Sequence, residues 1–156
     1  MENRHILPIL MCAAVMLATV ATVATVATVA TAEPPGAEVA FKIHIEPRRG
    51  GEILCALYEK ESEWLSKKVF RSTRADPTGE WVTCTFTKVP RGIFAAAALH
   101  DEDGNKTMTK GLFGLPKEGY TTSRDAQEKG FYPDWEDAVF SFKGETPGVV
   151  LGHMHY

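Results

Sequence analysis

Apolar and polar side chains alternate along several short stretches of the chain. In residues 39–45 every second side chain, from Val39 to Ile45, is apolar, and Lys42 and His44 lie between them. Successive side chains of a β-strand point to opposite faces, so this pattern is typical of a strand with one buried face. Alternation, or a short apolar run bounded by turn residues, predicts five further strands, at residues 52–58, 81–87, 93–99, 137–143 and 148–156.

The spacing of these strands predicts the fold class. Residues 52–58 are fairly apolar on both faces, which favours a central strand, and the small apolar residues of 93–99 fit an interior strand. Six or seven short strands separated by turns, with no recurrent helical pattern, predict an all-β fold. We therefore expect a single six- to seven-stranded antiparallel β-sandwich.

Two segments are predicted as loops. Residues 71–80 contain Asp76-Pro77 and Thr78-Gly79, which favour turns. Residues 111–135 give about 25 positions with no confident strand. Loops longer than about 12–15 residues are usually functional or disordered, so this segment is either a binding surface or a packed lid over the sandwich edge.

The first 32 residues differ from the rest. Arg4 precedes an uncharged stretch, residues 6–32, whose most apolar part spans 6–17 and which ends in Ala30-Thr31-Ala32. This order is typical of a secretory signal peptide, which implies a periplasmic or secreted protein, a short linker at 33–37 and a domain at 38–156. An uncleaved membrane anchor is the alternative, because more than 20 uncharged residues are long enough to span a bilayer.

Composition excludes some partners and leaves the cysteines open. The 156 residues are 44% hydrophobic and 24% charged and carry a net charge of −3, which is ordinary for a globular protein. A nucleic-acid-binding domain would have a basic patch or a pI above about 9, so we expect no nucleic acid partner. Cys55 and Cys84 fall on apolar strand faces, where they form either a disulfide, if their strands are neighbours or face one another, or two free buried thiols.

The loop after residues 93–99 carries the most suggestive polar residues. Asp101, Asp103 and Asn105 place oxygen atoms at positions 1, 3 and 5, as in the beginning of a calcium-binding loop, but positions 6 and 12 are Lys106 and Leu112 instead of glycine and an acid. The alternative is a tight turn closed by local hydrogen bonds. The possible cofactor is therefore Ca²⁺ or none.

A catalytic interpretation of the same region uses His100, Asp101 and Glu118. An imidazole and two carboxyl groups can perform general acid–base catalysis if they share a pocket. No nucleophile beside a base is evident in the sequence, so a hydrolase is the less favoured alternative.

Four motifs resemble a known family. They are VPRGIFA at 89–95, HDEDGN at 100–105, GLPKEGY at 114–120 followed by Ser123, and DWEDAVF at 134–140. Together they resemble a bacterial exported family known only as domain of unknown function 2141, over nearly all of residues 33–156. The resemblance implies a transthyretin-like or carboxypeptidase-regulatory-like β-sandwich made with a signal peptide, and it implies no activity.

The expected function is that of a non-enzymatic binding or accessory module of the cell envelope, whose partner is an envelope protein or a glycan. Membrane contact is expected only through the N-terminal segment, if that segment is not cleaved. The working surface is expected in the loops at 100–105 and 114–125. Its candidate residues are His100, Asp101, Asp103, Asn105, Lys117, Glu118, Tyr120 and Ser123.

Overall fold

The described part of the chain is built almost entirely from strands. The structure is a computed structural model that describes residues 37–46, 50–130, 132–145 and 147–156, so the predicted signal segment 1–32, nearly all of the predicted linker and residues 47–49 lie outside the described residues. The described strands are β1 Val39–His44, β2 Glu52–Tyr58, β3 Arg71–Ala75, β4 Trp81–Phe86, β5 Gly92–Asp101, β6 Tyr120–Thr122, β7 Phe140–Phe142 and β8 Gly148–His153.

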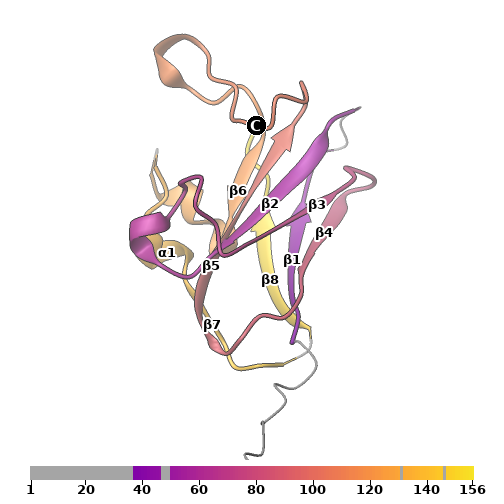
Figure 1. Ribbon diagram of the computed structural model, residues 1–156. Coiled ribbons are helices and arrows are strands. Elements are labelled where there is room, and N and C mark those ends of the chain that lie inside the picture. The colour runs from indigo at the N-terminus through magenta and orange to yellow at the C-terminus, as the bar shows by residue number, and fades with distance from the viewer. Residues whose placement is uncertain (1–36, 47–49, 131, 146) are drawn as a thin grey trace, which may run out of the picture. The chain divides into compact units, whose positions relative to one another are not determined.

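The strands form two sheets, which confirms the predicted all-β sandwich (Figure 1). One sheet has the order β4-β1-β8, and the other has the order β3-β2-β5-β6, with β7 pairing the start of β5. β2 and β5 are interior strands, as predicted. The sandwich is not wholly antiparallel as predicted, because β1 and β8 run parallel. The chain enters β8 at the end of the sheet where β1 also begins, so that Gly148 lies opposite Val39.

The core lies between the sheets and follows the alternation seen in the sequence. Phe41 and Ile43 of β1 face Ile53 and Leu57 of β2, and all four side chains are fully buried within one hydrophobic cluster. Burying a large apolar side chain contributes roughly 1.5–3 kcal/mol, so the set of inward positions on these two strands supplies a large share of the folding free energy.

A disulfide joins the two sheets through this core. Cys55 of β2 and Cys84 of β4 are bonded, and both residues are buried. The bridge links positions 29 residues apart. Closing a loop of that length in the unfolded chain stabilises the fold by about 3.5 kcal/mol in the chain-entropy model.

The structure also changes the interpretation of two predicted segments, residues 71–80 and residues 137–143. Residues 71–75, predicted as part of a loop, form β3 at the sheet edge, where Ser72 and Arg74 face solvent and leave little hydrophobic signal. The strand predicted at 137–143 shortens to β7, because the helical turn α1, Trp135–Ala138, precedes it. This turn buries Ala138 against Ala95, with Trp135 beside them.

The predicted loop at 111–135 contains short ordered elements. They are the 3₁₀ turn η2 Leu112–Gly114, the strand β6 and the 3₁₀ segment η3 Ser123–Lys129. A further 3₁₀ turn, η1 Glu61–Glu63, lies between β2 and β3. None of the helices in the described residues is both long and apolar enough to cross a membrane.

Candidate functional site

The carboxylate of Asp101 holds the loop that follows β5. Asp101 is the last residue of that strand and is 1% exposed. Its Oδ1 accepts hydrogen bonds from the backbone N–H groups of Gly104 at 2.9 Å and Asn105 at 3.1 Å, and its Oδ2 accepts one from Lys106 N–H at 3.0 Å. Local hydrogen bonds of this kind close a tight turn, the arrangement considered as the alternative to a calcium loop.

Glu118 ties the same loop to the segment that returns to β6. Its side chain is buried, and Oε1 accepts a hydrogen bond from the N–H of Glu102 at 3.0 Å while Oε2 accepts one from the N–H of Thr109 at 2.8 Å. A buried carboxylate without donors would be costly, and here both oxygens have one. Glu118 therefore binds both ends of the loop that runs from residue 102 to residue 109.

Asp103 lies at the exposed tip of the turn. Its Oδ2 accepts hydrogen bonds from the Thr109 hydroxyl at 2.7 Å and the Asn105 amide at 2.8 Å, and its Oδ1 accepts one from Asn105 N–H at 3.0 Å. The hydrogen bond from Thr109, and then that from the Asn105 backbone, hold the pKa of the Asp103 carboxyl below its ordinary value.

These three carboxylates are the one grouping in the described part of the chain with the geometry of a metal site. Asp101, Asp103 and Glu118 each offer an oxygen, and these atoms lie within 4.8 Å of one another. Oxygen ligands so placed are the kind that Ca²⁺ prefers. Both oxygens of each carboxylate already accept hydrogen bonds from the loop, however, so an ion would have to displace some of these donors.

The structure does not bring His100 together with Asp101. The two residues are adjacent on β5, so their side chains point to opposite faces of the sheet. His100 is fully buried, with Nε2 at 3.2 Å from the Gly50 carbonyl oxygen and Nδ1 at 2.9 Å from the Tyr156 hydroxyl. Because a carbonyl only accepts, Nε2 carries a proton and donates it to Gly50, while Nδ1 lies in hydrogen-bond contact with the Tyr156 hydroxyl. Both ring nitrogens thus have structural partners.

The remaining candidate residues lie apart from one another. Lys117 is exposed beside Gly111. Tyr120 lines a surface groove on the β3-β2-β5-β6 sheet. Ser123 is fully buried: its Oγ accepts a hydrogen bond from Ala96 N–H at 2.9 Å and donates one to the Ala138 carbonyl at 2.6 Å, so it fastens η3 to β5 and α1.

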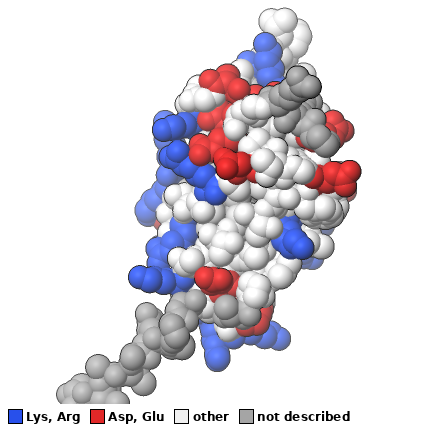
Figure 2. Space-filling view, turned by 90° about the vertical axis from the view of Figure 1, so that its right-hand side faces the viewer, with Lys and Arg blue, Asp and Glu red and all other residues white. Residues whose placement is uncertain are grey.

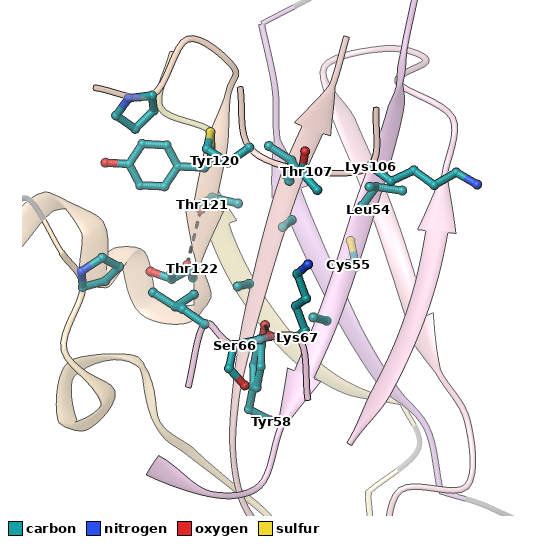
Figure 3. A pocket seen from close by; sticks show the side chains of 18 of the residues that line it. Leu54, Cys55, Tyr58, Ser66, Lys67, Lys106, Thr107, Tyr120, Thr121 and Thr122 are labelled. Atoms are coloured by element: carbon teal, nitrogen blue, oxygen red, sulfur yellow. Dashed lines mark hydrogen bonds between the residues drawn. The ribbon is translucent and has the colours of Figure 1, made fainter. Parts of the chain in front are cut away.

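The groove, about 760 Å³ in volume, lies on the outer face of this sheet (Figure 3). The register places Ala56 of β2 opposite Ala97 of β5, and Leu54 opposite Leu99. Alanine leaves a hollow where a larger side chain would fill the surface, so the two central alanines form a low floor between the leucine pair and Tyr58. Short outward side chains on both central strands therefore create the groove.

Three segments form the two walls of the groove. The chain after β5 makes one wall, and the segments before β3 and before α1 make the other. The wall residues are Lys106, Thr107, Met108, Lys110 and Pro116 on the first side, and Leu65, Ser66, Lys67, Tyr132 and Pro133 on the second. The Asp101 and Glu118 hydrogen bonds fix the first wall, because they hold the backbone of Lys106 and Thr109.

The charge around the groove is of one sign. Lys67, Lys106 and Lys110 line it, and no Asp or Glu is among its described lining residues. None of the three lysines forms an ion pair within the described residues, although four other cationic side chains do. Figure 3 shows Lys67 over the central strands, whereas the Lys106 side chain starts beside Leu54 and points outward, away from the other labelled side chains. Figure 2 shows basic side chains along the left-hand margin of its view and acidic ones gathering toward the top.

Burial also affects Tyr58 at one end of the groove. Desolvation raises the pKa of its phenol above the ordinary value, so the hydroxyl keeps its proton and donates to the Ser66 carbonyl at 3.2 Å. This hydrogen bond holds the second wall against the floor.

Sequence reasoning did not predict the groove as such, although the predicted loop at 114–125 supplies several of its lining residues, Tyr120 among them. The predicted working surface was the pair of loops at 100–105 and 114–125, and the structure shows that the first of these loops is closed on itself by hydrogen bonds. The available signal was the small residues Ala56 and Ala97 on two predicted interior strands. Their significance depends on the cross-strand register, which the pattern of either strand alone does not give.

Comparisons with known proteins identify the family and nothing more specific. No significant match was found among curated proteins or among solved structures. Residues 42–149 match a family described as an uncharacterized protein conserved in bacteria (DUF2141), which is the family that the motifs resembled. With most of its length matched, the chain belongs to this uncharacterized bacterial family.

Proposed function

We propose that the protein is a non-enzymatic binding module of the cell envelope that holds a small amphipathic molecule, with an apolar body and one anionic group, in the groove on the β3-β2-β5-β6 sheet. The observation that carries this proposal is the groove itself: an apolar floor on a sheet, with three lysines at its margin that form no ion pair within the described residues. Its volume of about 760 Å³ falls within the range of about 300–1,000 Å³ that is usual for small-molecule sites.

The polarity of the groove supports this class of ligand. Leu54, Leu99 and Tyr58 offer apolar surface, and serine and threonine hydroxyls around them can fix a polar group. The lysines attract an anion, and no carboxylate among the described lining residues repels it. This local positive charge is not a consequence of the overall charge, which is −3.

The absence of histidine and carboxylate side chains from the described lining of the groove supports a binding role instead of a catalytic one. The described lining residues include no histidine or carboxylate that would act as a general base, and the Cys55 sulfur is held in the disulfide. The location in the envelope rests on the signal-like segment 1–32 and on the bacterial family.

A variant that fills the groove tests the site. Ala97→Trp places an indole on the floor, whereas Val149→Trp adds the same bulk to β8 in the other sheet, where Val149 is exposed. We expect Ala97→Trp to weaken dodecanoate binding at least tenfold in a calorimetric titration and Val149→Trp to leave it unchanged. Equal affinity in both variants would remove the groove as the site.

A second pair of variants tests the anionic group. Lys106 and Lys88 are both exposed and both have left-handed backbone, with φ of 62° and 55°, but only Lys106 lines the groove. Lys106→Gly should weaken dodecanoate binding two- to fivefold, as expected for one exposed charge pair, and leave dodecanol binding unchanged. Lys88→Gly should alter neither. Equal wild-type affinity for the acid and the alcohol would remove the anionic group from the proposal.

A divalent-cation module is the second candidate, because the oxygens of Asp101, Asp103 and Glu118 lie within 4.8 Å of one another. A bound ion would raise the melting temperature by mass action. An increase at millimolar Ca²⁺ relative to EDTA would support this candidate. An unchanged melting temperature would show that the loop is held by its own hydrogen bonds.

A further inference from the structure

Residues 109–117 form a narrow hairpin that leads away from the groove wall. The N–H of Lys117 donates to the Thr109 carbonyl at 2.9 Å, and the N–H of Gly111 donates to the Leu115 carbonyl at 2.7 Å. A β-bridge between Lys110 and Pro116 lies between these two pairs. Figure 1 shows this part of the chain extending beyond the ends of the strands. Since Glu118 holds Thr109 at its base, the hairpin presents its tip in a fixed direction.

The tip of the hairpin is apolar and unusually exposed. Leu112 is 84% exposed and Phe113 is 95% exposed, and Leu115 beside them is 49% exposed. Phe113 also has φ of 65°, a left-handed conformation that is unfavourable for a bulky side chain. Exposed clusters of large apolar side chains mark interaction sites, so a surface that covers the tip is expected.

Positive charge flanks this tip. Lys110 and Lys117 stand on the two sides of the hairpin, and residues 106–117 contain no Asp or Glu. Neither lysine forms an ion pair with another described residue. Attachment to a bilayer surface combines inserted apolar side chains with basic residues that attract anionic headgroups, and each signal alone is weak.

We propose that the 109–117 hairpin docks the protein on an anionic lipid bilayer, with Leu112 and Phe113 inserted at the headgroup boundary and Lys110 and Lys117 against the headgroups. The narrow tip offers neither a groove nor a strand edge that a folded protein could bind. A lipid bilayer can instead adapt to the tip, because its surface is fluid. The tip residues Leu112, Phe113 and Leu115 do not line the groove, although Lys110, Gly114 and Pro116 of the same hairpin do, so the tip variants test docking apart from the groove.

Sedimentation with vesicles tests the docking of the full chain. The wild-type protein should bind vesicles of phosphatidylcholine with a quarter phosphatidylglycerol, and bind vesicles of phosphatidylcholine alone more weakly. Lys110→Gln combined with Lys117→Gln should reduce the affinity for the anionic vesicles by about fivefold per lysine. Added salt should weaken binding in the same direction, because it screens exposed charges.

The apolar contribution needs a matched control. Leu112→Ser combined with Phe113→Ser should abolish the part of vesicle binding that the hairpin supplies. Val149→Ser combined with Leu151→Ser removes a pair of exposed apolar residues from β8 and should leave vesicle binding unchanged. The N-terminal segment is identical in all variants, so the differences report on the hairpin.

A fluorescent side chain at the tip tests directly whether the tip enters the bilayer. Phe113→Trp should show fluorescence quenching by lipids with brominated acyl chains, beyond that of the wild-type tryptophans. Unaltered sedimentation of the Leu112/Phe113 variant, or an absence of added quenching in Phe113→Trp, would overturn the proposal. Both outcomes are independent of dodecanoate binding in the groove.

Discussion

Single carboxylates organise the loop beside the groove. Asp101 accepts three backbone hydrogen bonds and Glu118 accepts two, and both side chains are buried. Such groups stabilise a loop because they satisfy backbone donors that would otherwise be left without partners. At this scale the sequence identified the right residues, since acids and amides spaced by two residues favour local hydrogen bonding. It did not show which oxygen meets which donor, because that depends on the backbone path of the loop.

Replacement of Asp101 tests its structural role. Asp101→Asn exchanges one accepting oxygen for an NH₂ group that faces backbone N–H donors, so we expect a loss of about 1–3 kcal/mol in the free energy of unfolding. Urea unfolding measures this loss. Asp76→Asn is the control, because the Asp76 side chain is exposed and has no hydrogen-bond or ion-pair partner among the described residues. A similar stability for both variants would contradict the account of the loop.

Acid should loosen the same loop through Asp103. The folded-state pKa of Asp103 is lowered, so its contribution to stability is present above the unfolded value of about 3.8 and is lost as the pH falls through the folded value. The hydrogen bond from Thr109 is the largest cause. Thr109→Val should therefore raise the pKa of Asp103 toward its ordinary value in a carboxyl NMR titration, and an unchanged pKa would contradict this cause.

Alternate residues of one strand lie in the core and at the candidate site. β5 sends His100 to the buried face and Asp101 to the loop, and the same alternation sends Ala96 to the core and Ala97 to the groove. The sequence predicted strands of this kind well, because alternation is a local signal. It missed β3, since edge strands carry few apolar residues, and it missed β6, since three residues are too short for a period to be visible.

Ser123 tests the attachment of the elements that flank β5. Ser123→Ala removes a hydroxyl that bridges Ala96 N–H and the Ala138 carbonyl, and it leaves these buried groups unpaired. We expect a loss of about 1–3 kcal/mol in the free energy of unfolding by urea titration. Ser141→Ala on the exposed side of β7 should cost less than about 0.5 kcal/mol, and equal losses in the two variants would contradict the bridging role.

The molecule as a whole is a sandwich fastened across its core. The Cys55–Cys84 disulfide joins the two sheets, and the groove lies on the outer face of the sheet that contains Cys55. The sequence could predict the sandwich from strand spacing and could name the two cysteines. It could not predict the groove, because the groove depends on four strands in register and on walls supplied by three separate segments, residues 65–67, 106–116 and 132–133.

Reduction of the disulfide tests the cross-link. With the thiols free, the unfolded chain regains the entropy of a 29-residue loop, and the free energy of unfolding should fall by about 3.5 kcal/mol. Urea titrations with and without dithiothreitol measure this difference, with mass spectrometry to verify reduction. Identical curves for the oxidised and reduced protein would contradict the proposed stabilisation.

The central claim, that the groove is the ligand site, is tested most directly by NMR of the ¹⁵N-labelled protein during a titration with dodecanoate. The account predicts saturable shifts of the amide signals along Leu54–Tyr58, Ala97–Leu99 and Lys106–Lys110, with Val149 and Leu151 of the other sheet unaffected. No saturable shifts, or shifts centred on β8, would contradict it.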